Sequence, residues 1–597
     1  MDNAIQGKIA GVRVQSISSE AGADTKINIR GISSVSAGSG PLLVVDGQPM
    51  PDGFSALNSA DVESVEVLKD AASAAIYGSR GANGVILVTT KSGKSGETKY
   101  YFKTTSGVKE AYETYDIMSS KDYVERLYSE QKLRDADPLW TSDYGSSLPS
   151  ADKWRAQYNI ENDLLGGKGT NYQDEALRTA YYQDMQFNVS GGGEKNKFYI
   201  STGYQNDQGL MLKSEFEKLN FRAKFDLKLT DKLRLNINLN PSNTKTERPA
   251  VNYIDFTRFP SFLPVYHTAT TANFINGQQP GRNIQVGAYA EDDDFANLVY
   301  SGLDPNGVAY TTAANAVPFT TSNTNPIRAL LEQNDNNNQF RFQGSVALDY
   351  NIADGLDFRT AQNIYYKDSK RVETGAANAA RFGNPNYATY TNTNYFDFLT
   401  ENTLNYKKSV GDHDFGALGG FTFQSTRTKS LVTAGTTFPT DFIKNLNFAS
   451  VVLQPQQSDE SVGLVSFLGR FNYSYKDKYL FMASYRTDGS SRFADGNKWG
   501  GFPAVSLGWV ISKENFMSEV SAISRLALRA SYGATGNNGI GEFQYQNYLN
   551  SANYLSGIGT GSVSNGLSNT SNLNNNPDIT WERTFSSNFG LDVQKQI

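Results

Sequence analysis

Apolar and polar residues alternate along most of the chain after residue 97, with the period of two that a β-strand imposes on its two faces. In the stretch 221–229, Phe, Ala, Phe, Leu and Leu occupy one face, whereas Arg, Lys, Asp and Lys occupy the other. A three-residue turn at 230–232 leads into a return strand with the same division. The recurring pattern predicts further antiparallel strands within 340–359, 396–423, 467–485, 505–511, 526–532 and 581–593.

The predicted connections between these strands are of two kinds. Tight turns fall at 192–197, 230–232, 353–355, 410–413 and 476–478. Long segments rich in Asn, Ser, Thr and Gly alternate with them, at 110–180, 241–338, 367–394, 425–460 and 534–578. A globular sandwich also alternates, but it has no reason to place every long loop at one end. A transmembrane antiparallel β-barrel has short turns on one side of the membrane and long loops on the other, and we predict this fold class.

The first 95 residues follow a different pattern. Short apolar runs predict strands at 9–14, 25–31, 41–47, 62–67 and 84–90. An alanine-rich stretch, 69–78, ends in glycine and predicts a short helix. These elements indicate a small mixed α/β domain ahead of the barrel.

The composition agrees with a barrel. The chain has 597 residues, of which 12% are aromatic and 19% charged, with a formal net charge of -6. No basic excess is present, so we expect no nucleic-acid partner. No stretch approaches the roughly 18 apolar residues of a spanning helix, which excludes a helical membrane protein but not a barrel, whose strands average to a polar sequence.

Residues suited to catalysis are scarce. The chain has no cysteine and only two histidines, His267 and His413, which are far apart and outside any HExxH frame. Disulfides, thiolate zinc sites and cysteine nucleophiles are therefore excluded. We expect no enzyme activity, no catalytic or metal-binding residues and no cofactor.

Three local motifs resemble ligand-binding motifs, but for each of them we favour a structural interpretation. The glycine-rich stretch 78–84 lies between a helix and a strand, the reverse of a phosphate loop, and lacks the GK[ST] ending. We predict a tight turn there, with glycines at positive φ. The acidic run 291–294 lacks a calcium-loop spacing, so we expect a solvated loop, and the same holds for 334–338.

Several motifs in a fixed order identify a family resemblance. In the amino-terminal domain they are 3–12 (NAIQGKIAGV), 29–31 (IRG), 41–47 (PLLVVDG), 65–71 (VEVLKDA), 75–84 (AIYGSRGANG) and 86–93 (ILVTTKSG). In the barrel they are 488–493 (DGSSRF), 499–509 (WGGFPAVSLGW), 528–540 (LRASYGATGNNGI) and 577–582 (PDITWE). Over nearly its whole length the chain resembles the SusC/RagA family of TonB-dependent outer-membrane transporters of Bacteroidetes.

The resemblance implies a plug domain, residues 1–95, inside the lumen of a barrel formed by 97–597. Family barrels have 22 strands, whereas we count about 13 or 14 here, so the barrel is partial. The family also begins with a signal peptide and a TonB box, and neither precedes Asn3. The chain is therefore expected to be truncated at both ends.

The resemblance also implies plug motif residues, although it assigns them no individual role. They are Arg30, Gly31, Asp46, Gly47, Lys69, Asp70, Tyr77, Gly78, Arg80, Gly81 and Gly84. The plug charges, which include Glu63 and Glu66, are expected either to face solvent or to pair with cations of the barrel wall. Candidate wall cations are Arg222, Lys224, Arg341 and Arg359.

The function implied is active import across the outer membrane of a Gram-negative cell, embedded in outer-membrane lipid. The cargo would be an oligosaccharide or an oligopeptide, and abundant Tyr, Trp and Asn in the long loops favour a glycan. The implied partners are a SusD-like surface lipoprotein, and TonB with its inner-membrane motor. The alternatives are a siderophore or cobalamin receptor of the same fold, and a passive porin or adhesin. Substrate-binding residues are unknown at this stage.

Overall fold

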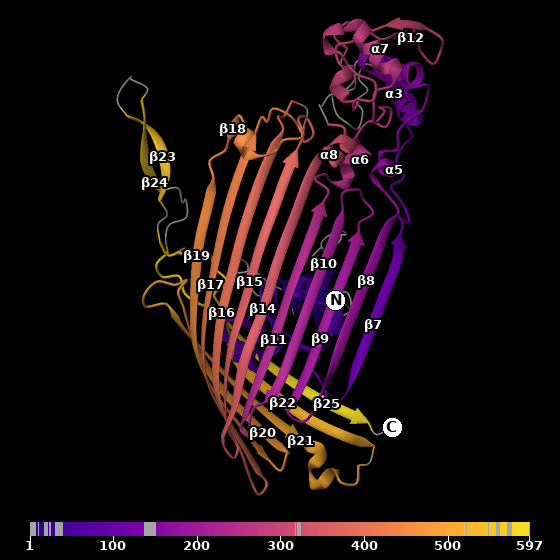
Figure 1. The fold of residues 1–597 in the computed structure, drawn as a ribbon. Coiled ribbons are helices and arrows are strands. Elements are labelled where there is room, and N and C mark those ends of the chain that lie inside the picture. Colours follow the sequence, from indigo (N-terminus) through magenta and orange to yellow (C-terminus); the bar gives the residue numbers. More distant parts are fainter. Residues whose placement is uncertain are drawn as a thin grey trace.

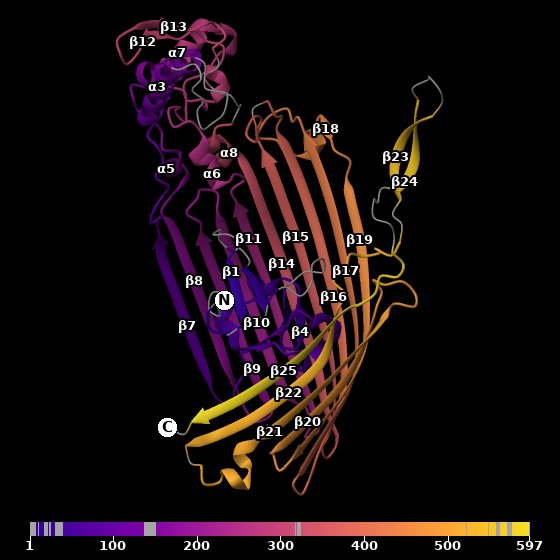
Figure 2. The same ribbon diagram turned by 180° about the vertical axis from the view of Figure 1, so that it is seen from behind.

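A tall, curved antiparallel sheet dominates the molecule, and the amino-terminal elements lie against its concave side (Figures 1 and 2). The computed structural model describes residues 7–9, 11–16, 22, 25–29, 31, 40–136, 151–316, 318, 324–381, 383–520, 522–546, 549–556, 562–569 and 576–595. The sheet has 15 strands and is called the wall below. It confirms the mostly β, antiparallel prediction. In the described ranges, no helix has the length and apolar character needed to cross a membrane.

Each strand of the wall pairs with its neighbour in sequence, so the wall is a continuous meander. Its ordered path runs from β25 to β7, and the short β18 lies off this path, paired to the end of β17. The strands are β7 (Gly96–Lys109), β8 (Ala180–Gly192), β9 (Asn196–Gln208), β10 (Glu215–Lys228), β11 (Leu233–Arg248), β14 (Gln333–Ala353), β15 (Leu356–Gly375), β16 (Tyr387–Val410), β17 (His413–Thr436), β18 (Val451–Val452), β19 (Gln456–Tyr475), β20 (Tyr479–Ser490), β21 (Trp499–Val510), β22 (Ile523–Asn537) and β25 (Glu582–Lys595).

The apolar face of the wall is the exposed one. On β10, Leu219 and Phe221 are 56% and 43% exposed, whereas the intervening Asn220 and the following Arg222 are 5% and 1% exposed. A water-soluble sheet buries its apolar face, because burial of that face drives its folding. The inverse arrangement is that of a barrel with an outward apolar band and a polar interior.

The predicted tight turns are confirmed, and they gather at one end of the wall (Figure 1). Strands continue into three predicted long loops and also into both ends of 241–338, where β11 runs to Arg248 and β14 begins at Gln333, so these loop predictions are wrong in part. β15 extends to Gly375 and β16 begins at Tyr387, so most of 367–394 is paired sheet. β17 and β19 likewise enter 425–460, and β22 and the hairpin β23 (Leu549–Ser556) with β24 (Ser562–Asn569) lie in 534–578. Above the apolar band both faces of a strand are polar, so the period of two disappears from the sequence there.

The remaining long segments, 110–180 and 241–338, contain a compact module above β8–β14 (Figure 1). Its core is largely aromatic and aliphatic, and includes Tyr172, Phe256, Phe295 and Leu330. The elements are α3 (Ser120–Ala136), α4 (Ala151–Asn159), a π-helix (Ile160–Leu164), α5 (Tyr172–Ala176), α6 (Tyr253–Arg258), α7 (Ala269–Gln278), two 3₁₀ turns (Pro280–Arg282 and Asp292–Phe295), β12 (Ser301–Leu303), β13 (Ala309–Thr311) and α8 (Pro326–Glu332).

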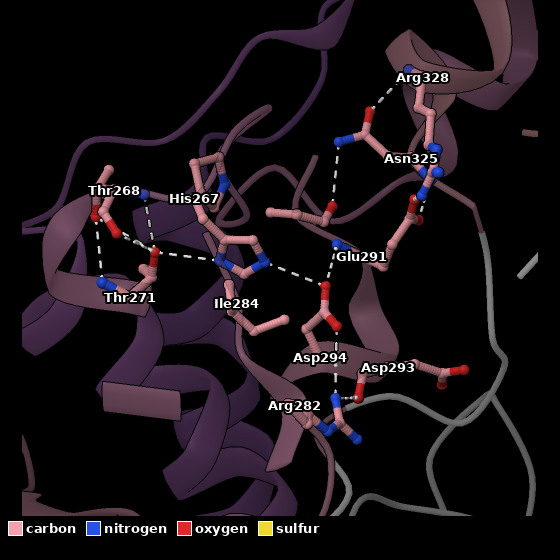
Figure 3. Close-up of polar contacts among 12 residues, drawn as sticks. His267, Thr268, Thr271, Arg282, Ile284, Glu291, Asp293, Asp294, Asn325 and Arg328 are labelled. Atoms are coloured by element: carbon pink, nitrogen blue, oxygen red, sulfur yellow. Dashed lines mark hydrogen bonds and ion pairs between the residues drawn. The ribbon is translucent and has the colours of Figure 1, made fainter. Parts of the chain in front are cut away.

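The acidic run 291–294 is not the solvated loop that we expected, because it anchors this module (Figure 3). Glu291 is 2% exposed; it accepts from Arg328 Nη1 at 3.0 Å and from the Asn325 backbone N–H at 2.7 Å. Burial raises the pKa of Glu291 against these favourable contacts. Asp294 lies 3.1 Å from the ring Nε2 of the buried His267. The stretch 334–338 is also no loop, since it lies in β14.

The charges of the acidic run are therefore used in packing. The structure contains, within its described ranges, no group of three or more His, Cys, Asp and Glu side chains that could hold a metal ion.

The amino-terminal domain comprises a hairpin and a four-stranded sheet ordered β4-β3-β6-β5. The predicted short helix at 69–78 is confirmed in position, but only α2 is α-helical, and a 3₁₀ segment interrupted at Gly78 follows it directly. The elements are β1 (Val12–Ser16), β2 (Thr25–Ile29), β3 (Leu42–Val45), β4 (Gln48–Met50), 3₁₀ turns (Gly53–Ala56 and Ser59–Asp61), β5 (Val62–Leu68), α2 (Ala71–Ala74), a 3₁₀ segment (Ala75–Arg80) and β6 (Val85–Thr90).

The outward apolar band makes a testable prediction. Val346 lies outward near the middle of the band on β14, and Val346→Arg should destabilise the inserted wall by about 2–4 kcal/mol, because a charge enters the hydrocarbon. The measurement is urea unfolding in lipid vesicles, followed by heat-modifiable electrophoretic mobility. Asn336→Arg, outward on the same strand but above the band and opposite Glu247, is the control and should cost little. Equal losses in the two variants would contradict the assignment.

Candidate functional site between the amino-terminal domain and the wall

The amino-terminal domain presents acidic side chains to the wall from one short hairpin. β3 and β4 are joined by Asp46 and Gly47, whose φ angles are 49° and 92°. A two-residue turn with positive φ at both positions suits the right-handed twist of a hairpin, and Asp-Gly is a favoured pair for it. The turn points the Asp46 carboxylate at the wall.

Asp46 is held by four side chains and one backbone group. Arg222 of β10 donates from Nη2 at 2.6 Å, and Asn238 of β11 donates from Nδ2 at 3.0 Å. Thr90 donates from its backbone N–H and its hydroxyl, and Lys224 Nζ lies 3.8 Å away. Burial alone would raise the pKa of Asp46, but the two cations and the Thr90 hydrogen bonds outweigh it and lower the pKa.

Asp52, just beyond β4, forms a second centre of the same kind. Lys367 of β15 approaches to 2.6 Å, Arg341 of β14 donates from Nε at 2.9 Å, and the Tyr365 hydroxyl donates at 2.6 Å. Burial opposes ionisation here as well, yet Lys367, Tyr365 and Arg341 together lower the pKa of Asp52. Asp46 and Asp52 are therefore anionic at neutral pH.

Further polar contacts continue along β9 and β10. The buried Asp61 accepts from the Tyr199 hydroxyl at 2.9 Å and from the Ser201 hydroxyl at 2.7 Å. Lys218 donates to the Leu57 carbonyl at 2.8 Å, and Asn58 donates to Gln186 at 2.6 Å. Polar contacts thus extend along this side of the interface, beside an apolar cluster that Tyr365 of β15 shares with the domain.

A different part of the wall, formed by β17 and β20, contacts residues 76–80 of the 3₁₀ segment. Asp488 of β20 accepts from the Ser79 backbone N–H at 2.8 Å, and Arg486 of β20 donates to the Ile76 carbonyl at 2.7 Å. Arg486 and Asp488 also pair with each other at 2.7 Å. Arg80 donates to Gln424 of β17 at 2.6 Å.

Gly78 and Gly84 have the positive φ that we predicted for 78–84, whereas Gly81, with φ -91°, does not. Gly78 has φ 55° and Gly84 has φ 83°, whereas Gly81 ends the 3₁₀ segment with its N–H on the Gly78 carbonyl. A Cβ at Gly78 would meet the side chains of Arg486 and Asp488. The conformation and the close approach both select glycine at this position.

The other predicted residues are placed as follows. Tyr77 is half-buried and lines a polar cavity of about 440 Å³ between the domain and the wall, together with Asp46, Lys224 and Asp226. Burial raises the pKa of Tyr77. Lys69 and Asp70 are half-buried beside α2, Gly31 is exposed with φ 106°, Glu63 and Glu66 are exposed on β5, and Arg30 lies outside the described residues.

One candidate wall cation is paired elsewhere. Arg359 binds Asp349 of the neighbouring strand at 2.7 Å rather than an acid of the amino-terminal domain. The register of β14 and β15 sets the two residues directly opposite each other, which explains the pairing.

Sequence reasoning missed Asp52, Lys367, Arg486 and Asp488. Lys367 falls within the stretch 367–394, which we took for a loop, and Asp488 opens a recognised motif without a known role. Asp52 follows Pro51 in an irregular segment that has no periodicity to expose it.

The chemistry of the interface is reversible. Buried ion pairs gain Coulomb energy but lose hydration, so their net contribution to stability is small, whereas breaking one partner is costly. Such an interface holds a domain firmly in one position without a large net binding energy.

Comparisons with known proteins bear on this arrangement. Residues 1–85 match the family model described as TonB-dependent Receptor Plug Domain. The chain is 33% identical over 609 residues to TonB-dependent receptor P39 of Formosa agariphila, covering 99% of this chain and 50% of that protein. It is 32% identical over 618 residues to TonB-dependent receptor SusC of Bacteroides thetaiotaomicron, covering 98% and 55%. The chain thus spans about half the length of the curated relatives that it matches.

Among solved structures, the RagAB peptide importer in its closed-closed state aligns with a TM-score of 0.77 at 21% identity, covering 99% of this chain and 63% of that one. The ferric enterobactin receptor PfeA of Pseudomonas aeruginosa aligns with a TM-score of 0.52 at 12% identity, covering 100% and 66%. At these identities the likeness is one of fold.

Asp52 provides a test of the interface. Asp52→Asn leaves Arg341 and Lys367 facing a neutral amide, and should lower the free energy of unfolding of the amino-terminal domain by about 3 kcal/mol at pH 7. The folded-state pKa of Asp52 lies below the unfolded value of about 3.9, so the wild-type advantage is complete well above that pH. It should disappear as the pH falls through the folded value.

The measurement is urea unfolding of the domain at several pH values. Asp368→Asn, which removes one partner of the outward pair with Lys370, is the matched control and should change stability by less than about 1 kcal/mol. A pH-independent difference between wild type and Asp52→Asn would contradict the ionic account.

Gly78 provides a second test. Gly78→Ala should destabilise the domain by about 1–3 kcal/mol more than Gly53→Ala, since both glycines have similar positive φ but only Gly78 contacts the wall. Hydrogen exchange of residues 76–80 and urea unfolding report the effect. Equal destabilisation would mean that backbone strain alone selects glycine at position 78.

Proposed function

The chain belongs to the SusC/RagA family of TonB-dependent receptors, and from this premise we propose that it imports oligosaccharides or oligopeptides across the outer membrane of a Gram-negative cell. Its curated relatives are SusC and SusC-like TonB-dependent receptors, and its fold is that of outer-membrane barrel receptors. Relatives that are receptors and transporters are consistent with a protein that is not an enzyme.

One observation carries the proposal: the amino-terminal domain is held against the polar face of the wall through the ion pairs of Asp46 and Asp52. Such contacts close the lumen, yet they can be broken and remade without a large net cost. A domain that only stabilised the wall would gain more from an apolar interface. A domain that must repeatedly move aside is better served by balanced polar contacts.

The proposed cycle uses the two parts as gate and channel. Residues 1–95 form the gate, and 97–597 contribute the wall of the channel. A SusD-like surface lipoprotein would deliver cargo from outside, and TonB, driven by the inner-membrane motor, would displace the gate from below. The motif residues Asp46, Gly47, Gly78 and Arg80 would hold the closed state.

The cargo class remains a choice between oligosaccharide and oligopeptide. The relation to SusC and the aromatic, amide-rich loops support a saccharide, because aromatic rings stack on sugar faces and amides bind hydroxyls. The similarity to the RagAB peptide importer is one of fold, and it supports a common transport architecture rather than a peptide cargo. A siderophore or cobalamin receptor is the alternative with the same fold.

Deletion of TonB tests the mechanism. We expect uptake of labelled oligosaccharide or oligopeptide by cells that carry the protein to cease in a TonB-deletion strain, since nothing would then displace the gate. Uptake that continues unchanged would instead show a passive pore.

Iron-limited growth separates the alternative within the fold. Growth that depends on this protein under iron limitation, without uptake of either polymer, would establish a siderophore receptor. Parallel assays with saccharide and peptide pools would decide the cargo class.

A further inference from the structure

The connection between β21 and β22 differs from the tight turns at the same end of the wall. It carries two 3₁₀ turns, Ile511–Lys513 and Asn515–Met517, seen as the orange coils below β21 in Figure 1. The tips of the tight turns are polar, for example Glu194-Lys195 and Asp231-Lys232. The longer connection instead exposes apolar side chains: Phe516 is 67% exposed and Val520 is 39% exposed.

Glu514 fixes the height of this connection on the wall. Its carboxylate accepts from the Tyr479 hydroxyl at 2.7 Å, from Trp509 Nε1 at 3.1 Å and from Lys478 Nζ at 3.2 Å. Tyr479 and Trp509 lie on the outward face, 46% and 37% exposed, with their polar tips on one carboxylate. Tyr and Trp rings oriented in this way mark the boundary between the hydrocarbon and the headgroups of a membrane.

The connection joins two strands whose outward side chains are apolar. Outward Leu507 on β21 and Leu528 on β22 flank it, 56% and 43% exposed. An apolar hollow of about 770 Å³ joins these strands to Tyr479 and Trp509 on one side and to Leu591 of β25 on the other. The connection therefore leaves from and returns to strands whose outward face is apolar, and it exposes Phe516 and Val520 between them.

We propose that residues 511–520 form an interfacial anchor, with Phe516 and Val520 inserted at the headgroup–acyl boundary of the phospholipid leaflet on the tight-turn side. The proposal rests on the outer-membrane location given above. The occupant is lipid, because the connection lies at the level of Tyr479 and Trp509 and joins two strands whose outward face is apolar. An exposed aromatic ring on a short segment at that depth gains by leaving water.

The anchor gives β20–β25 a fixed depth in the bilayer. Glu514 links the inserted segment to β20 and β21 through hydrogen bonds rather than through a flexible tether. Vertical movement of this part of the wall would have to withdraw Phe516 from the boundary.

Single-cysteine labelling tests the anchor without background, since the chain contains no cysteine. Phe516→Cys, carrying a polarity-sensitive fluorophore, is reconstituted as purified protein into phospholipid vesicles. We expect blue-shifted emission, stronger quenching by lipids with a shallow nitroxide than by lipids with a deep one, and weak quenching by aqueous iodide.

Asp354→Cys, on an exposed tight turn at the same end, is the aqueous control, and outward Leu528→Cys is the lipid control. A Phe516 label that behaves like the Asp354 label, beside a shielded Leu528 label, overturns the anchor alone. Shielding in native membranes that is lost in pure phospholipid would identify a protein partner and also overturn it. A Leu528 label that is exposed to water would contradict the proposed insertion of the wall into the membrane.

Discussion

The structure depends on the alternation of side chains along each strand when lipid covers one face of the sheet. Lipid selects apolar residues outward, and the intervening side chains are turned inward, where many are polar and must find a partner. Arg222, at 1% exposure, cannot remain there as an unpaired charge. Asp46 supplies the compensating charge from a different domain, so the wall and the domain satisfy each other's polar groups.

This mutual satisfaction has a particular energetic character. The desolvation of Asp46, Asp52 and their cations offsets most of the attraction between them. These pairs therefore fix the position of the domain on the wall but add little net stability to it. The module built on 110–180 and 241–338 behaves differently. Its apolar core buries Phe256, Phe295 and Leu330, and its own ion pair between Glu291 and Arg328 fixes the packing within one unit. The molecule therefore combines a module held by an apolar core with an inner interface held largely by ion pairs.

Much of this was predictable from the sequence because the lower wall obeys the period of two. The turns at 230–232 and 410–413 are found directly by that pattern. The upper halves of β15 and β16 are not, since both their faces are polar and the ladder of backbone hydrogen bonds leaves no mark on side-chain type. The acidic run 291–294 was predicted to be a solvated loop because the sequence does not show its tertiary contacts. In the fold, Arg328 contacts Glu291 and His267 contacts Asp294.

The candidate site divides in the same way. Asp46-Gly47 carries its own turn signal, and Arg222 and Arg341 were suspected as wall partners because they occupy the polar face of their strands. Arg359 occupies the same face, yet it pairs with its cross-strand neighbour Asp349 rather than with the amino-terminal domain. Asp52 required the three-dimensional course of the chain after β4, which no local pattern encodes.

The placement of Asp46 and Asp52 along one hairpin has a mechanical consequence. The two carboxylates stand at the start and just beyond the end of β4, so tension passing along the chain from its amino-terminal side reaches Asp46 before Asp52. The contacts of Asp46 would then break before those of Asp52, so the two centres would rupture in sequence and not simultaneously. The peak force needed to free the hairpin is set by one of the two centres rather than by their sum.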